Sequence, residues 1–296
     1  HNIHIARFGY DEVGNMTSEM YFNGHEQPVA SEKSGVFGYK YEYDGDGFRI
    51  RTTCVDADGE PMFNRNGYVA EVYEPDENNF VARIQLVDEE NNPVTGNFNG
   101  DRTSGIRFIN TATGLPLEMS LLDENGEQTD NELSISTIRR TFNDQGDMLT
   151  EETLRLDGTP VGRNGNDSRS VTDYDHLGRV KSRAYFDSDD NPTVNADGVH
   201  KIELTYSPYG SLEKVENFDT EGRPANSRYH FATHTVSYDS QGRNVAEAFL
   251  DADGKPVMYD GYSRIVNAYD ASTARVNQTQ FYDDHDRLLR TRHMTH

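Results

Sequence analysis

The sequence has little of what builds most compact domains: it contains one cysteine, no tryptophan and only 34% hydrophobic residues. The single cysteine, Cys54, excludes an intramolecular disulfide framework and a cysteine-rich metal site, so we expect it to be an apolar strand residue. No apolar run approaches the roughly 18 residues that a membrane span needs, and we expect no membrane insertion. Basic residues are also scarce, at 28 against 51 acidic ones, and the net charge of -23 argues against nucleic acid as a partner.

Aromatic residues, in contrast, are plentiful. The 17 Tyr and 14 Phe among 296 residues are too many for a disordered chain. Combined with a mean hydropathy of -0.85, they predict an elongated, ordered protein with a thin core and a large surface. The chain begins with His1 rather than Met and shows no signal peptide, so we expect a processed product or a fragment of a longer protein.

An internal repeat runs through nearly the whole chain. Its marker is a proline, replaced once by glutamine, that recurs every 32 to 35 residues. In the fifth unit the stretch LRLDGTP places Leu156 and Asp157 two positions later than usual, which predicts a shorter turn there. The markers are Pro28, Pro61, Pro93, Gln128, Pro160, Pro192, Pro224 and Pro256. Such regularity identifies a tandem repeat protein.

Two turn signals enclose a strand in each unit. The first reads YDxxG, as in YDHLG, and the second reads DxxGxP, as in DADGEP and DADGKP. Asp caps such a turn by accepting backbone N–H bonds, and Gly tolerates the left-handed conformation that the turn requires. The roughly nine residues between the signals are rich in β-branched and aromatic side chains and too short for a typical helix. We therefore predict an all-β fold, a β-solenoid or stacked hairpins, with about eight to nine two-stranded units in a single elongated domain over residues 1–296.

The first turns carry a resemblance to a known family. Residues 10–15, 174–179 and 238–243 resemble the YD repeats of bacterial Rhs-type proteins, whose units centre on Tyr-Asp-x-x-Gly-Arg. The resemblance covers most of the chain and implies a bacterial β protein that is secreted or displayed at the surface. In that family the repeats spiral into shells that enclose toxins, or form parts of adhesive surface proteins. The period here is longer than the YD unit, and the processing segment that ends a toxin shell is missing, which favours a surface stalk.

Acidic residues gather in the proline-marked turns and are the candidate metal ligands. Two carboxylates about 4 Å apart repel by roughly 4 kcal/mol at an effective dielectric of about 20, so they must turn into water or share a cation such as calcium. An EF-hand is excluded, because counting from Asp56 puts Gly59 fourth and Gly67 twelfth. The alternative is that the carboxylates cap the turns. The candidate calcium ligands are Asp56, Asp58, Asp187, Asp189, Asp251 and Asp253.

Tyrosine supplies the candidate contact residues. One column of tyrosines recurs at the same repeat position, and we expect that column to pack against the neighbouring unit. Its members are Tyr10, Tyr43, Tyr174, Tyr206 and Tyr238. Tyrosines outside the column are available to stack on a sugar ring or to contact a partner. The candidate ligand-binding residues are Tyr209, Tyr229, Tyr259 and Tyr262.

The sequence shows no motif typical of an enzyme. It lacks a nucleophile elbow, an HExxH zinc motif, a Walker loop and a complete GxGxxG. With 51 acidic residues, any chosen pair of carboxylates is uninformative about glycoside hydrolysis. We therefore expect a protein that is not an enzyme and has no cofactor other than calcium.

These observations favour a non-catalytic extracellular scaffold for adhesion, surface extension or filament assembly. The repeats run to both ends without an obvious capping unit, so open sheet edges are available for self-association. The expected partner is a protein or glycan at a bacterial cell surface. The alternatives are a glycan- or calcium-binding repeat module and an Rhs-like shell or container.

Overall fold

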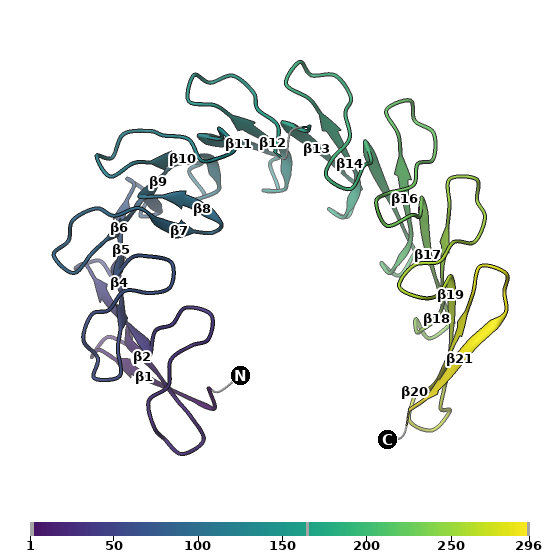
Figure 1. Ribbon diagram of the computed structural model, residues 1–296, viewed down its shortest axis with the longest axis horizontal. Helices are drawn as coiled ribbons and strands as arrows, with labels where there is room; N and C mark the ends of the chain where they lie inside the picture. Colours follow the sequence, from purple (N-terminus) through teal and green to yellow (C-terminus); the bar gives the residue numbers. More distant parts are fainter. Residues whose placement is uncertain (1–2, 164–165, 295–296) are drawn as a thin grey trace. The chain divides into compact units, whose positions relative to one another are not determined.

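The protein is all-β, as the turn pattern predicts. The computed structural model describes residues 3–163 and 166–294, which form 21 strands and no helix (Figure 1). Accordingly, no helix of these residues is long and apolar enough to cross a membrane. The strands fall into two compact units: the first comprises His1–Arg140 and Thr153–Thr159, and the second comprises Thr141–Glu152 and Pro160–His296.

The strands alternate with tight turns in both units. The first unit contains β1 (Ile5–Tyr10), β2 (Met16–Phe22), β3 (Gly38–Tyr43), β4 (Arg49–Val55), β5 (Ala70–Pro75), β6 (Val81–Val87), β7 (Gly96–Phe98), β8 (Asp101–Thr103), β9 (Gly105–Asn110) and β10 (Pro116–Leu122). Residues of both units form β11 (Thr137–Phe142) and β12 (Met148–Leu154). The second unit continues with β13 (Arg169–Tyr174), β14 (Val180–Phe186), β15 (Lys201–Tyr206), β16 (Leu212–Phe218), β17 (Thr233–Tyr238), β18 (Asn244–Leu250), β19 (Arg264–Tyr269), β20 (Val276–Tyr282) and β21 (Leu288–His293).

Each repeat is a β-hairpin that pairs with the next along the chain. Strand β17 pairs antiparallel with β18 from Thr233 opposite Leu250 to Tyr238 opposite Asn244, with a bulge just before Tyr238. Strand β18 then pairs over three residues with β19 of the following hairpin, also antiparallel. The same two registers recur in the first unit, in β3 with β4 and in β4 with β5. The array therefore consists of hairpins that pair side by side.

The first turn of the repeat owes its shape to aspartate and glycine. In the turn between β17 and β18, the Asp239 N–H donates to the Arg243 carbonyl at 3.0 Å, and the Asp239 carboxylate accepts the backbone N–H of Gln241 at 2.9 Å and that of Arg243 at 3.0 Å. Gly242 has a φ of 75°, in the left-handed region where a β-carbon is penalised. The sequence motif is thus a hydrogen-bonding requirement of the turn.

The second turn explains the proline marker. All eight marker positions are single β-bridge residues. Pro256, for example, lies opposite Leu250, the last residue of β18. A residue without an N–H donor suits such a bridge, because the ladder does not continue beyond it. The chain then leaves as a loop towards the next hairpin.

The prediction of a shorter turn in the fifth unit is wrong. Strand β12 ends at Leu154, six positions before Pro160, as in the other units. The Arg155 N–H donates to the Thr159 carbonyl at 2.8 Å, and the Gly158 N–H donates to the Arg155 carbonyl at 3.0 Å, so the turn has its usual length. Leu154 fills the apolar position at 2% exposure, and Arg155 simply replaces the capping aspartate.

The apolar core is distributed unequally between the two units. Cys54 is buried in β4, as expected, and burial raises the pKa of its thiol to about 11. Among the described residues, the buried hydrophobic side chains of the first unit are Val36, Cys54, Val55, Tyr68, Val69, Ala70, Tyr73, Ile84, Leu86, Val87, Ile106, Leu121, Leu122, Ile135 and Leu154. Those of the second unit are Val161, Val199, Ala232 and Phe249.

Candidate binding site

One repeat carries an additional hairpin, and it borders a hollow in the first unit. After Pro93 the chain forms β7 and β8, which pair from Gly96 opposite Thr103 to Phe98 opposite Asp101. Asn99 and Gly100 join the two strands with φ angles of 53° and 95°, as the two-residue turn of a tight hairpin requires. The insertion accounts for the 35-residue spacing of this repeat, between Pro93 and Gln128.

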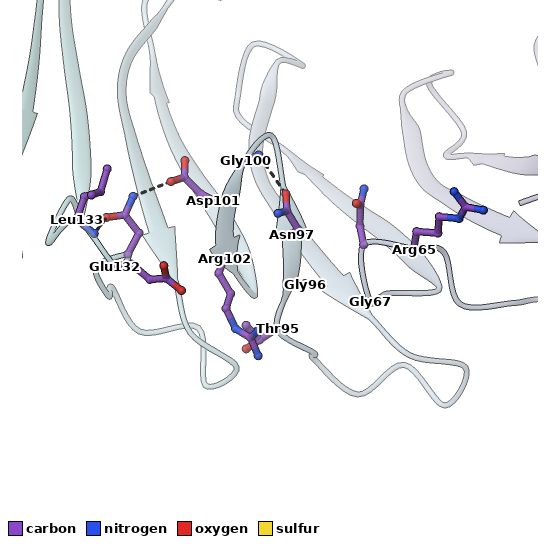
Figure 2. A pocket seen from close by; sticks show the side chains of 12 residues that line it. Arg65, Gly67, Thr95, Gly96, Asn97, Gly100, Asp101, Arg102, Glu132 and Leu133 are labelled. Carbon is purple, nitrogen blue, oxygen red and sulfur yellow. Dashed lines mark hydrogen bonds between the residues drawn. The ribbon is translucent and has the colours of Figure 1, made fainter. Parts of the chain in front are cut away.

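The additional hairpin is anchored on both sides by asparagine residues of neighbouring loops. The Asn97 N–H donates to the Asn66 carbonyl at 2.7 Å. On the other side, the Asn131 side-chain amide donates to the Asp101 carboxylate at 2.6 Å. Figure 2 shows Asp101 and Asn97 on the two strands of the additional hairpin. Gly96 allows this approach, since a β-carbon there would lie 2.8 Å from the Asn66 carbonyl oxygen. The hollow is therefore built into three successive repeats.

The hollow has a volume of about 750 Å³ and a mainly polar lining. The Arg65 guanidinium is held by the Glu32 carbonyl, whereas the exposed Arg102 side chain has no hydrogen-bond or ion-pair partner in residues 3–163 and 166–294. A second hollow of about 220 Å³ adjoins it and shares Arg102 and Asn131. Amides and guanidinium groups in this arrangement offer both donors and acceptors to a hydroxylated ligand.

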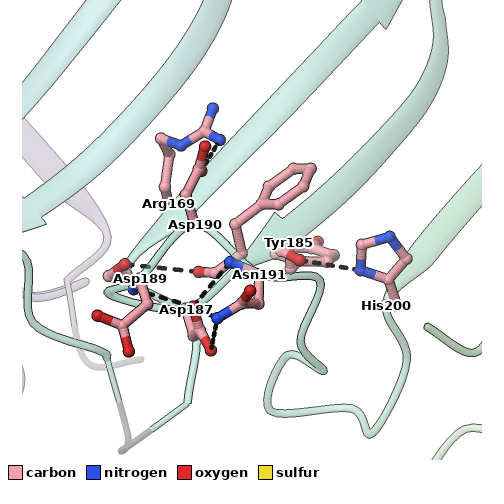
Figure 3. A network of polar contacts seen from close by, with 9 residues as sticks. Arg169, Tyr185, Asp187, Asp189, Asp190, Asn191 and His200 are labelled. Carbon is pink, nitrogen blue, oxygen red and sulfur yellow. Dashed lines mark hydrogen bonds and ion pairs between the residues drawn. The ribbon is translucent and has the colours of Figure 1, made fainter.

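The first aspartate of each predicted calcium pair caps its own turn. Each of Asp56, Asp187 and Asp251 accepts, on one carboxylate oxygen, two backbone N–H groups at 2.9 Å, from the residues two and four positions later. Figure 3 shows this arrangement around Asp187, whose carboxyl pKa is lowered by the Asn191 N–H. The capping interpretation is thus confirmed for these three residues.

The second aspartate of each pair contributes its backbone rather than its side chain to the cap. Asp58, Asp189 and Asp253 are exposed and contribute their backbone N–H groups to the caps. Within the described residues, three potential metal ligands converge within 4.8 Å only at Asp283, Asp284 and His285, which the sequence did not single out. Calcium binding by the six aspartates stays a prediction.

Three of the four candidate tyrosines lie in one aromatic cluster of the second unit. The Tyr259 ring lies 5.9 Å from Tyr229 and 4.8 Å from Phe249, measured between ring centroids. Tyr262 lies 5.9 Å from Phe249 and 5.4 Å from Phe281, and burial raises its phenol pKa. Each of these tyrosines therefore packs against other aromatic rings of the cluster. Of these three, only Tyr229 is exposed, at 39%.

Tyr209 is different, because it lies in a first turn and is 93% exposed. Its backbone N–H donates to the Ser207 hydroxyl oxygen at 3.2 Å, which belongs to the cap of that turn. The side chain is therefore available to a partner, but it has no binding pocket around it among those found in the described residues.

The recurrent tyrosines connect neighbouring hairpins, as the sequence predicts, except for Tyr10 in the first hairpin, which is 62% exposed. The Tyr238 hydroxyl donates to the Leu212 carbonyl at 2.9 Å, and Leu212 is the first residue of β16 in the preceding hairpin. The Tyr206 hydroxyl makes the same bond to the first residue of β14, Val180, at 2.9 Å. Equivalent bonds are made by Tyr43, Tyr174 and Tyr269. Each bond ties the end of one strand to the start of a strand about 26 residues earlier.

Comparisons with known proteins identify no family. No family model matches the chain, and no curated protein matches it. Solved structures that match include a crystal structure titled TcdB2-TccC3-TEV, at 13% identity and a TM-score of 0.35, over 94% of this chain and 14% of that one. The Photorhabdus luminescens Tc holotoxin pore matches at 13% identity and a TM-score of 0.29, over 97% of this chain and 17% of that one. A porin-like protein from Bacteroides uniformis matches at 10% identity and a TM-score of 0.27, over 87% and 85% of the two chains. The chain thus spans less than a fifth of the length of the two toxin chains.

Proposed function

We propose that this chain is a non-catalytic repeat scaffold that extends from a bacterial cell surface and presents its polar loops for adhesion. The observation that carries the proposal is the recurrence of one inter-hairpin joint. In each joint of the described residues a three-residue antiparallel ladder ties successive hairpins together, as in β16 with β17. In five of these joints a tyrosine hydroxyl adds a hydrogen bond, as from Tyr238 to the Leu212 carbonyl. Nearest-neighbour joints of this kind build length without a closed core.

The use of the carboxylates supports the same proposal. Among the turn aspartates, Asp56, Asp187 and Asp251 direct an oxygen to backbone N–H groups of their own turns. These groups are therefore committed to shaping the array rather than to chemistry on a substrate. The extracellular, bacterial location in the proposal relies on the Tyr-Asp turns that resemble Rhs-type repeats, and a single buried cysteine is compatible with it.

Electron microscopy of the purified chain tests the scaffold. Eight hairpins that add two strands each at about 4.8 Å per strand give particles roughly 80 Å long, and we expect elongated particles without a closed lumen. Closed hollow particles would contradict the scaffold and favour a container. A hydrolase screen on the same preparation tests the non-catalytic part, which a turnover that co-purifies with the chain would overturn.

A second candidate function, saccharide binding, is favoured by the hollow at β7 and β8. Its amide groups act as donor and acceptor at once, as sugar hydroxyls do, and the unpartnered Arg102 adds a planar donor. We expect neutral oligosaccharides to give a signal on a glycan array, and Arg102→Ala to remove it. The control is Lys33→Ala, which removes the same charge from an exposed position in the same unit. An array signal unchanged by Arg102→Ala would exclude this hollow as the site.

A further inference from the structure

The last strand of the second unit departs from the repeat. Elsewhere the second turn closes on a single bridge, such as Leu250 with Pro256, and the next hairpin arrives after a loop. After β20 the equivalent bridge position, Tyr282 opposite Leu288, instead begins a full strand that pairs as far as Gln278 opposite His293. Strand β21 therefore covers the edge of β20 to which the first strand of a following hairpin is joined in other repeats.

Strand β21 also differs in chemistry from the rest of this acidic chain. Its sequence, LLRTRH, has two arginines and a histidine and no acidic residue, whereas the whole chain has a net charge of -23. Leu288 and Leu289 are 53% and 47% exposed. The Arg290 guanidinium lies 4.2 Å from the centroid of the Phe281 ring. Arg292 has no side-chain partner in residues 3–163 and 166–294.

The outer edge of β21 pairs with no strand among residues 3–163 and 166–294. An unpaired edge presents backbone N–H and C=O groups that an extended chain can complete. We propose that this edge is a docking site for an extended, acidic segment of a partner protein, which adds to β21 as an antiparallel strand. Cross-strand pairs of opposite charge and the exposed leucines would favour a segment in which acidic and apolar residues alternate.

A second copy of this chain fits the edge poorly. Pairing β21 with β21 of another copy would bring the arginines of both strands together, and like charges on facing strands are destabilising. Strand β1 of another copy does not suit it either. Strand β21 follows β20 and so runs in the direction of the first strands such as β19, which means that β1 would join it in parallel if the second copy continued the array head to tail. Every strand pair in the described residues is antiparallel.

Binding of synthetic peptides to the full chain tests the proposal. The probe is a fluorescent ten-residue peptide in which glutamate alternates with valine and threonine, followed by fluorescence anisotropy. A peptide with N-methyl groups on alternate backbone nitrogens keeps the charge but cannot form a complete ladder, and a lysine version reverses the charge. We expect the glutamate peptide to bind, the other two to bind at least tenfold more weakly, and affinity to fall with added salt.

Two variants locate the site. Arg292→Glu should weaken binding of the glutamate peptide at least tenfold without unfolding the chain, because Arg292 has no side-chain partner in the part of the chain that the structure describes. Lys181→Glu changes the net charge equally on β14, an interior strand, and should leave binding unchanged. The proposal is overturned if the glutamate peptide does not bind, if the N-methylated peptide binds equally well, or if Arg292→Glu leaves the affinity for the glutamate peptide unchanged. It is also overturned if the chain forms a dimer that Arg292→Glu strengthens, because the edge would then bind a second copy. None of these results depends on whether the chain acts as a surface scaffold.

Discussion

The two units build the same hairpin repeat but stabilise it by different means. In the described residues, 15 of the 19 buried hydrophobic side chains belong to the first unit and four to the second. The second unit instead has an aromatic cluster around Phe249 and aspartate–arginine pairs within its turns, such as Asp175 with Arg179 and Asp239 with Arg243. The difference shows that the turns and inter-hairpin bonds specify the fold, and that the side chains between them are free to vary.

One pair of equivalent residues shows how the two units differ in stabilisation. Leu86, in β6, is fully buried at 0% exposure. The equivalent residue of β16 in the second unit is Asn217, which is 6% exposed and donates through its side-chain amide to the Phe231 carbonyl at 3.3 Å. An apolar contact in one unit is thus replaced by a satisfied hydrogen bond in the other.

The largest expected effect comes from removing an apolar side chain in the first unit. Leu86→Ala should lower the free energy of unfolding by about 3 kcal/mol, from lost burial and the resulting cavity. Asn217→Ala should cost only about 1 kcal/mol, as the net loss of one hydrogen bond. Hydrogen exchange read separately in each unit measures both. Equal losses at the two positions would mean that the units are stabilised alike.

Acid should affect the second unit more strongly. The Arg179 side chain lowers the carboxyl pKa of Asp175 from 3.8 to about 2, and the Ser272 hydroxyl lowers that of Asp270 from 3.8 to about 2. Because the folded-state pKa is depressed, the stabilisation is complete above pH 3.8 and is lost as the pH falls towards about 2. We expect hydrogen exchange in the second unit to accelerate across that window. Asp175→Asn should reduce the acceleration, and an unchanged profile would contradict the assignment.

The inter-hairpin bond of the second unit should have a smaller effect. Tyr238→Phe removes the hydroxyl that bonds the Leu212 carbonyl and should cost about 1 kcal/mol. The matched control is Tyr10→Phe at the same repeat position in β1. That ring is 62% exposed, and its hydroxyl has no partner in the described residues, so we expect no measurable change. A loss at Tyr10 as large as that at Tyr238 would show that the ring rather than the bond is responsible.

Salt should have the smallest effect. The turn pairs Asp239–Arg243 and Asp283–Arg287 have nitrogen–oxygen distances of 2.6 and 2.7 Å, but both arginines reach solvent. Exposed pairs contribute about 0–1 kcal/mol and are screened by salt. We therefore expect 1 M sodium chloride to lower the stability of the second unit slightly, as measured by thermal unfolding. The same salt should lower the stability of the Arg243→Gln variant by a smaller amount. A larger salt-induced loss of stability in the first unit would show that the first unit, rather than the second, depends on ion pairs.

The period of the sequence was enough to predict the hairpins, because each turn has its own chemical requirement. Asp239 and Gly242 can be identified from spacing alone, and so can the Tyr238 column. The additional hairpin was missed, although its Asn99–Gly100 turn and the longer spacing were visible, because a single insertion has no second copy to compare with. The fifth turn is hard to predict because Arg155 occupies the position of the capping aspartate, while Asp157 stands two positions later.

The candidate site was less predictable than the fold. The clustered charge of the aspartates suggested metal ligands. Their role depends on which backbone N–H groups they face, and a sequence does not show this. Tyr229 and Tyr259 look irregular in the sequence and come together only when two successive connections fold over Phe249. Arg102 carries no motif at all. Residues that act through proximity across repeats need the structure to be found.

The local pairing of the hairpins has a consequence for how the protein folds. Strands pair with their neighbours in the sequence, except that β6 pairs with β9 across the additional hairpin, and the tyrosine bonds reach back only about 26 residues. The relative contact order is therefore low for an all-β protein, and contact order rather than strand content governs folding rate. A hairpin can dock on the preceding one as soon as it leaves the ribosome or a secretion channel. The chain is thus suited to vectorial folding, in which each newly emerged repeat protects the open edge of the one before it.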